Sequence, residues 1–243
     1  MVIAVCGKPG SGKTLLTTYF LMKKFRKENN FFVRHFKKDH IFNNCYSNYP
    51  VKLGSETYSN KVNLLDFKDF NKWLMDSDIV LDEIQAYFDS TEYKSIPKPI
   101  ANNFQFHRHF GIHNIYCVSQ DLSRIPKVFR VLAQEYYQIH KHFKIPILGI
   151  AFFSYTIWYR EDDYGNPHKL TRDQKKNLNY EFKNKIIMFR YKKVYKAYDT
   201  KYMKVLVKDK ELFPTIQYSD NLLSLDEIYQ NFPSVANNNY KFM

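Results

Sequence analysis

Two hydrophobic patterns follow one another along this chain. Runs of mostly apolar, often β-branched residues cover 2–6, 79–81 and 115–119. Such runs are typical of strands buried on both faces of a parallel sheet. Apolar residues recur at helical spacing over 14–27 and 66–75. Strands that alternate with helices predict an α/β domain with a mainly parallel central sheet.

The pattern changes in the second half of the chain. Segments 150–160 and 185–198 are aromatic-rich and roughly alternating, which predicts antiparallel strands added to the parallel core. We therefore divide the chain into a core at 1–145, a basic, aromatic β extension of the same domain at 146–210, and a C-terminal tail at 211–243.

Aromatic residues also crowd two segments of the first half. The runs at 31–36 and 41–46 are separated by polar residues, and their aromatic and β-branched content predicts one or two strands. The helix predicted over 66–75 would follow, with Asp66 as its N-cap.

A glycine-rich loop joins the first strand to the first helix. Residues 7–14 fit the pattern G-x-x-x-x-G-K-[ST] at every fixed position. Glycines let the backbone N–H groups surround phosphate oxygens, Lys13 supplies charge to the β- and γ-phosphates, and the Thr14 hydroxyl binds Mg²⁺. The loop thus predicts ATP and Mg²⁺ as ligands. The predicted nucleotide-binding residues are Gly7, Lys8, Pro9, Gly10, Ser11, Gly12, Lys13 and Thr14.

Polar side chains at the ends of two later strands extend this candidate site. Asp82 and Glu83 end one apolar run as in a Walker B strand, in which the first carboxylate holds Mg²⁺ and the second polarises the attacking water. Gln120 ends the next run, where it senses the γ-phosphate, positions the attacking water, or only caps the following turn. Arg130, or alternatively Arg124, is either an arginine finger for a neighbouring subunit's nucleotide or a solvated side chain.

Charge is concentrated late in the chain. The 243 residues carry 37 Lys and Arg against 24 Asp and Glu, a formal net charge of +13, and residues 169–210 alone hold 14 against 4. Tyrosines and phenylalanines interleave with these lysines. The segment is therefore either a surface for single-stranded DNA or anionic lipid, or a core of aromatics under solvated lysines.

The remaining composition bears on location. Cys6, Cys45 and Cys117 are odd in number and form no C-x-x-C pair, so no disulfide framework is expected and a reducing compartment fits. The N-terminus has no signal-peptide pattern, and the longest charge-free run, 145–159, is too short to span a bilayer. A cytoplasmic protein, at most peripheral to a membrane, is expected.

Four segments together resemble the zonular occludens toxin-like family of filamentous bacteriophage assembly ATPases. They are GKPGSGKT at 7–14, LDEIQAYF at 81–88, FHRHFGIHNIYCVSQDLSRIPKVFR at 106–130 and KAYDT at 196–200. The resemblance spans about 1–200. It implies a RecA-like P-loop NTPase domain related to FtsK/HerA-type DNA motors, acting with phage assembly or coat proteins in virion extrusion at the host inner membrane. A homo-oligomeric ring would accommodate the arginine finger.

Family members carry a transmembrane helix and an outer domain after the ATPase, and no such segment is recognised here. We therefore expect a protein of the host cytoplasm that reaches the membrane through a partner or its basic surface. Two other functions remain open: a DNA-translocating or packaging ATPase outside filamentous phage, and a small-molecule kinase. The kinase is disfavoured, since Asp82, Glu83 and Gln120 suit activation of water.

Overall fold

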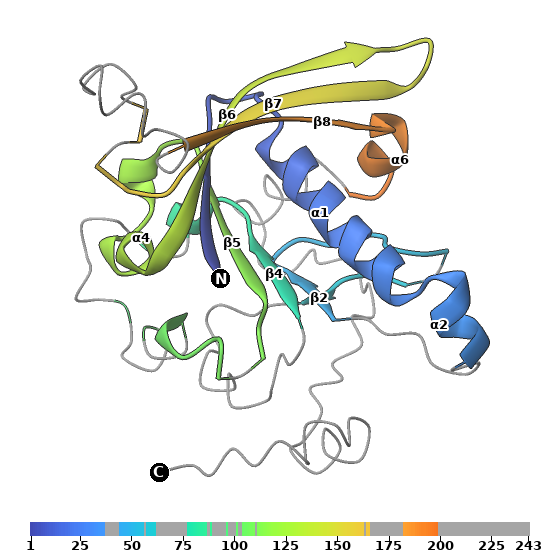
Figure 1. The fold of residues 1–243 in the computed structure, drawn as a ribbon, viewed down its shortest axis with the longest axis horizontal. Helices are drawn as coiled ribbons and strands as arrows, with labels where there is room; N and C mark the ends of the chain where they lie inside the picture. Colours follow the sequence, from blue (N-terminus) through green and yellow to red (C-terminus); the bar gives the residue numbers. More distant parts are fainter. Residues whose placement is uncertain are drawn as a thin grey trace, which may run out of the picture.

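Strand β1 (Val2–Cys6) lies near the centre of the sheet on which the domain is built (Figure 1). The computed structural model describes residues 1–36, 44–55, 57–61, 77–86, 88, 96, 101, 104–109, 111–162, 164–165 and 182–198. Within these ranges the sheet has eight strands in the order β3-β2-β4-β5-β1-β6-β7-β8. The other strands are β2 (Cys45–Ser47), β3 (Asn60–Lys61), β4 (Asp78–Leu81), β5 (Asn114–Ser119), β6 (Ala133–Ile145), β7 (Ile150–Trp158) and β8 (Phe182–Phe189).

The six strands β3, β2, β4, β5, β1 and β6, in sheet order, pair in parallel. Strand β7 is antiparallel to β6, and β8 is antiparallel to β7. This confirms the predicted α/β class with a mainly parallel sheet. Strand β6 joins the two parts, because its first half pairs with β1 and its residues from Tyr136 to Ile145 pair with β7. The predicted boundary after residue 145 thus falls at the turn of the β6–β7 hairpin.

Both faces of the sheet are covered, which explains the continuous apolar run in β1. Ile3 and Val5 pack on the side of helix α1 (Lys13–Glu28), whereas Val2, Ala4 and Cys6 face the opposite core. That second core includes the fully buried ring of Phe129, which lies on helix α4 (Lys127–Leu132). The short 3₁₀ helices η2 (Ile84–Ala86) and η4 (Leu122–Arg124) follow β4 and β5.

One predicted strand is wrong, and a second is shorter than predicted. Residues 31–36 form helix α2 (Phe31–Phe36), which begins where the Asn30 side chain accepts a 2.9 Å hydrogen bond from the Val33 amide. This local cap outweighs the strand propensity of aromatic residues. The strand predicted over 185–198 ends at Phe189, and helix α6 (Tyr191–Tyr195) follows it.

Several predictions fall on residues outside the described ranges. These are the helix over 66–75, the first half of the strand over 41–46, residues 169–181 and 199–210 of the basic segment, and the tail at 211–243. In the described part, no helix combines the length and apolar character that crossing a membrane requires. Cys6, Cys45 and Cys117 are buried free thiols.

Candidate nucleotide-binding site

The glycine-rich loop runs from the end of β1 into the first turn of α1. Gly10 and Gly12 have φ angles of 75° and 88°, in the left-handed region that glycine adopts without steric cost. A Cβ on Gly7 would lie 2.7 Å from the Ser11 Oγ and 3.0 Å from the Ile139 carbonyl oxygen. The three glycines therefore permit this tight turn, and Gly12 is the N-cap of α1.

Lys13 is the charged centre of the loop. Its side chain is buried, with the residue only 6% exposed, and its Nζ donates to the carbonyl oxygens of Gly7 at 3.0 Å and Lys8 at 3.4 Å. The Ser11 amide also donates to the Lys8 carbonyl, at 3.0 Å. The Lys13 ammonium is thus held beside the loop in which a phosphate would bind. This loop lies at the N-terminus of a helix of 16 residues.

The predicted metal ligands meet across the sheet. The Thr14 hydroxyl donates to the Asp82 Oδ2 at 2.7 Å, although 68 residues separate them. The strand order β4-β5-β1 and the parallel registers bring the carboxyl ends of these strands to one edge. Hydroxyl and carboxylate oxygens are ligands that Mg²⁺ accepts, so this donor set fits the ion.

Asp82 is buried, and burial raises its pKa to about 6. The hydrogen bond from Thr14 opposes that shift, and the nearby Glu83 carboxylate adds to it. Since the ionised form is the one penalised, a bound cation would relieve an electrostatic cost that the protein bears at neutral pH.

Asn48 fixes the backbone of Asp82. The Asn48 Nδ2 donates to the Asp82 carbonyl at 2.7 Å, and the Asp82 amide donates to the Asn48 Oδ1 at 2.8 Å. Asn48 directly follows β2, which pairs with β4. Its side-chain amide therefore bonds to the β4 side of the sheet one residue beyond the ends of the two strands. Sequence reasoning missed Asn48; its only signal was a polar residue just after a short strand.

Glu83 has a φ of 48°, an uncommon conformation for a residue with a side chain. Its amide donates to the Asp82 Oδ1 at 3.2 Å, and its Oε2 accepts a hydrogen bond from the Gln85 Nε2 on η2. Such backbone conformations often occur at functional sites. Gln85, also missed from the sequence, therefore orients the carboxylate predicted to act on water.

The residues after β5 reach the same edge of the sheet. Cys6 pairs in register with Ser119, so Gln120 begins the loop beside the glycine-rich loop. The Gln120 Oε1 lies 3.5 Å from the Nη1 of the exposed Arg124. Asp121 caps η4 by accepting hydrogen bonds of 2.8 Å from the Ser123 amide and hydroxyl, and these lower its pKa.

Arg130 has different surroundings. Its Nη1 lies 2.6 Å from the Glu161 Oε1, and its carbonyl accepts a 2.8 Å hydrogen bond from the Tyr136 hydroxyl. The guanidinium is therefore engaged within its own chain, whereas that of Arg124 faces solvent beside Gln120. The assignment of Arg130 as an arginine finger stays a prediction, and the geometry gives Arg124 the freer position.

Comparison with known proteins gives a family. The family model of the zonular occludens toxin (Zot) matches residues 1–182. No curated protein matches the chain. Among solved structures, the N-terminal domain of zonular occludens toxin from Neisseria meningitidis is 19% identical, with a TM-score of 0.48, and the match covers 82% of this chain and 98% of that one.

A second solved structure is the genome packaging NTPase B204 from Sulfolobus turreted icosahedral virus 2 in complex with ATP-gammaS. It is 14% identical, with a TM-score of 0.38, and the match covers 60% of this chain and 77% of that chain. The family match includes the glycine-rich loop, Asp82, Glu83 and Gln120. Because it extends over most of the sequence, this chain belongs to the zonular occludens toxin (Zot) family.

Proposed function

We propose that this protein is a Mg²⁺-dependent ATPase that powers filamentous phage morphogenesis and virion extrusion from the cytoplasmic side of the host inner membrane. The observation that carries the proposal is the 2.7 Å hydrogen bond between Thr14 and Asp82. It joins a complete phosphate-binding loop to a buried carboxylate of the kind that ATPases use to hold Mg²⁺. Family membership supports the phage context.

Each residue has a distinct role in the proposed reaction. Lys13 and the loop amides bind the β- and γ-phosphates, and Thr14 and Asp82 would hold the metal. When bound, Mg²⁺ neutralises charge on the transferred phosphoryl group. Glu83, oriented by Gln85, accepts a proton from the attacking water. Gln120, at the adjoining strand end, orients that water or senses the γ-phosphate.

ATP turnover by the purified protein tests the proposal. We expect hydrolysis that requires Mg²⁺ and stops when EDTA is added. The Lys13→Ala variant should bind no ATP and serves as the background, because it loses the charge held at the loop. Wild-type protein that bound ATP but released no phosphate under any Mg²⁺ concentration would refute the ATPase assignment.

A ring of subunits is proposed, in which an arginine completes the site of its neighbour. We prefer Arg124 to Arg130, since Arg124 is exposed beside Gln120 while Arg130 is paired with Glu161. In mixtures of Arg124→Ala with Lys13→Ala subunits, part of the lost activity should return, because some interfaces then join an intact loop to an intact arginine. Arg130→Ala mixtures are the matched comparison, and recovery only with Arg130→Ala would reverse the assignment.

A DNA-translocating or packaging ATPase is the alternative. Three exposed residues in and between β8 and α6 favour it, namely Lys183, Arg190 and Lys192, because lysines and arginines bind the phosphates along a strand. Stimulation of hydrolysis by DNA would favour this alternative, whereas stimulation by phage coat or assembly proteins would favour morphogenesis.

A further inference from the structure

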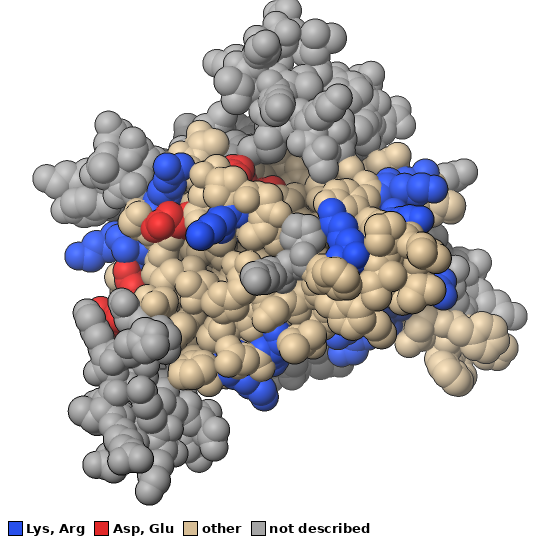
Figure 2. Space-filling view, turned by 90° about the horizontal axis from the view of Figure 1, so that it is seen from above, with Lys and Arg blue, Asp and Glu red and all other residues tan. Residues whose placement is uncertain are grey.

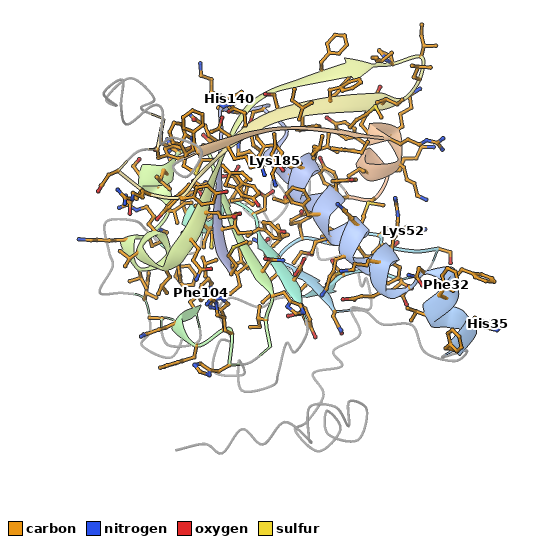
Figure 3. All side chains as sticks on the ribbon, in the orientation of Figure 1. Phe32, His35, Lys52, Phe104, His140 and Lys185 are labelled. Carbon is orange, nitrogen blue, oxygen red and sulfur yellow. The ribbon has the colours of Figure 1, made fainter. Side chains whose placement is uncertain are left out.

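Helix α2 carries an unusual set of exposed rings. Phe31, Phe32 and Phe36 are 76%, 70% and 83% exposed in a helix of six residues. The helix extends from the end of α1, and Figure 3 shows Phe32 and His35 pointing away from the domain. Exposed apolar groups gathered in this way commonly mark a binding surface.

The tip of the β6–β7 hairpin is a second apolar projection. Ile147 is 94% exposed and Leu148 is 63% exposed. The hairpin is held close to α6, since the Lys144 Nζ donates to the Tyr195 hydroxyl at 2.9 Å. In Figure 1 the hairpin tip, α6 and α2 project toward the same side of the molecule.

Positive charge lies along this side. Lys23, Arg26 and Lys27 are exposed on the last turns of α1, and Lys192 and Lys193 are exposed on α6. In Figure 2 Lys and Arg side chains are spread over both the left and the right of the molecule, whereas the Asp and Glu side chains in view lie left of centre. Apolar projections beside cationic residues complement the surface of an anionic bilayer.

We propose that this side of the protein, formed by α2, the end of α1, α6 and the hairpin tip, docks on an anionic lipid membrane. Phe31, Phe32, Phe36, Ile147 and Leu148 enter the interface between headgroups and acyl chains, and the lysines and arginines contact lipid phosphates. This deepens the proposed action at the inner membrane and rests on it for the identity of the bilayer. Docking itself requires no ATP hydrolysis, so the two can fail independently.

The geometry of the rings favours lipid over single-stranded DNA. Bases stack on flat aromatic faces arranged along a groove. The rings of Phe31 and Phe32 are instead nearly perpendicular, at 79°, as are those of His35 and Phe36, at 81°, and the one parallel pair is that of Phe31 with His35, at 18°, among the ring pairs described in α2. They project from the end of a helix, a convex arrangement that suits insertion into a lipid surface.

Vesicle sedimentation tests the proposal on the full chain. Wild-type protein should bind vesicles of phosphatidylglycerol and phosphatidylethanolamine, and should bind phosphatidylcholine vesicles weakly. The variant Phe31→Gln/Phe32→Gln/Phe36→Gln should bind these vesicles at least tenfold more weakly than wild type. The variant Ile147→Ser/Leu148→Ser should also bind them more weakly, by a smaller factor. Lys23→Gln/Arg26→Gln/Lys27→Gln should lose the preference for the anionic lipid.

Helix α4, on the opposite side in Figure 1, supplies matched controls. Val131 is 66% exposed and Lys127 is also exposed there, so Val131→Gln and Lys127→Gln should bind vesicles like wild type. Equal binding of anionic vesicles by the triple phenylalanine variant of α2 and the two α4 variants would overturn the proposal. So would an α2 variant that keeps vesicle binding but loses binding to an oligothymidine strand.

A gain-of-signal experiment avoids dependence on lost binding. In Phe36→Trp the new indole should shift its emission to the blue on addition of anionic vesicles and be quenched by brominated acyl chains. Val131→Trp should show neither change. Equal quenching in the two variants would show that another surface makes the contact. Absence of quenching in both, while the vesicles still sediment the protein, would show the same. Normal ATP turnover by each variant would show that the effects are confined to docking.

Discussion

Replacing Glu83 with glutamine is expected to leave ATP binding intact and to slow hydrolysis by about 10²–10⁴-fold, the usual contribution of a general base. The amide keeps the shape of the side chain and can still meet Gln85, but it cannot accept the proton of the attacking water. Nucleotide affinity should hold because the contacts of Lys13 and the loop with phosphate are unchanged.

Two measurements on the same samples check this prediction. Equilibrium binding of a fluorescent ATP analogue gives the affinity, and phosphate release under saturating ATP gives kcat. Gln85→Ala is the companion variant, since it leaves the carboxylate in place and removes only its hydrogen-bond donor. We expect a smaller loss there. Turnover by Glu83→Gln at the wild-type rate would show that another group activates the water.

The site was predictable where its chemistry lies in consecutive residues. Gly7 to Thr14 and the Asp82–Glu83 pair each carry their signal within one short segment, directly after an apolar run. The run fixes a buried parallel strand, and the residue after such a strand reaches the carboxyl edge of the sheet. Both segments were therefore expected at one edge of the sheet, and the structure adds the hydrogen bond from Thr14 to Asp82 there.

What escaped prediction depends on contacts between distant segments. The role of Asn48 requires β2 to lie beside β4, and the short β2 segment carries little periodic signal of its own. The pairing of Arg130 with Glu161 likewise requires the loop after β7 to return over α4. Patterns of hydrophobicity predict which strands exist but not which polar side chains meet across them.

The mistaken strand at 31–36 has a related cause. Its aromatic residues suit a strand that buries one face, yet the rings of Phe31, Phe32 and Phe36 bury little surface within this chain. The secondary structure is instead set by a local cap at Asn30. A segment whose apolar residues bury little surface follows local propensity, and it leaves its rings available for an external surface.

Asp82→Asn is expected to stabilise the nucleotide-free protein while removing Mg²⁺-supported hydrolysis. Burial raises the pKa of Asp82 from 3.8 to about 6, so keeping the carboxylate ionised at neutral pH costs the folded state roughly 3 kcal/mol, at 1.36 kcal/mol for each pKa unit. A neutral amide avoids this cost and can still accept a hydrogen bond from Thr14. It supplies no negative charge to a metal.

The sign of the pH dependence follows from the same shift. Because the folded pKa lies above the unfolded value, the contribution of Asp82 to stability is present at low pH and is lost as the pH rises from about 4 to about 6. Thermal unfolding of nucleotide-free protein should therefore show the largest advantage of Asp82→Asn above pH 6. The advantage should shrink in acid, where wild-type Asp82 is itself neutral.

Asp121→Asn is the matched control with the opposite sign. Hydrogen bonds from Ser123 lower the pKa of Asp121, so its charge stabilises the folded state above the unfolded pKa and that contribution is lost in acid. This variant should be no more stable than wild type at neutral pH and should still hydrolyse ATP.

Adding Mg²⁺ and a non-hydrolysable ATP analogue should raise the unfolding temperature of wild type far more than that of Asp82→Asn, because the amide supplies no negative charge to the ion. A lower unfolding temperature for nucleotide-free Asp82→Asn would mean that the ionised carboxylate is better satisfied by Thr14 and the Glu83 amide than its burial indicates.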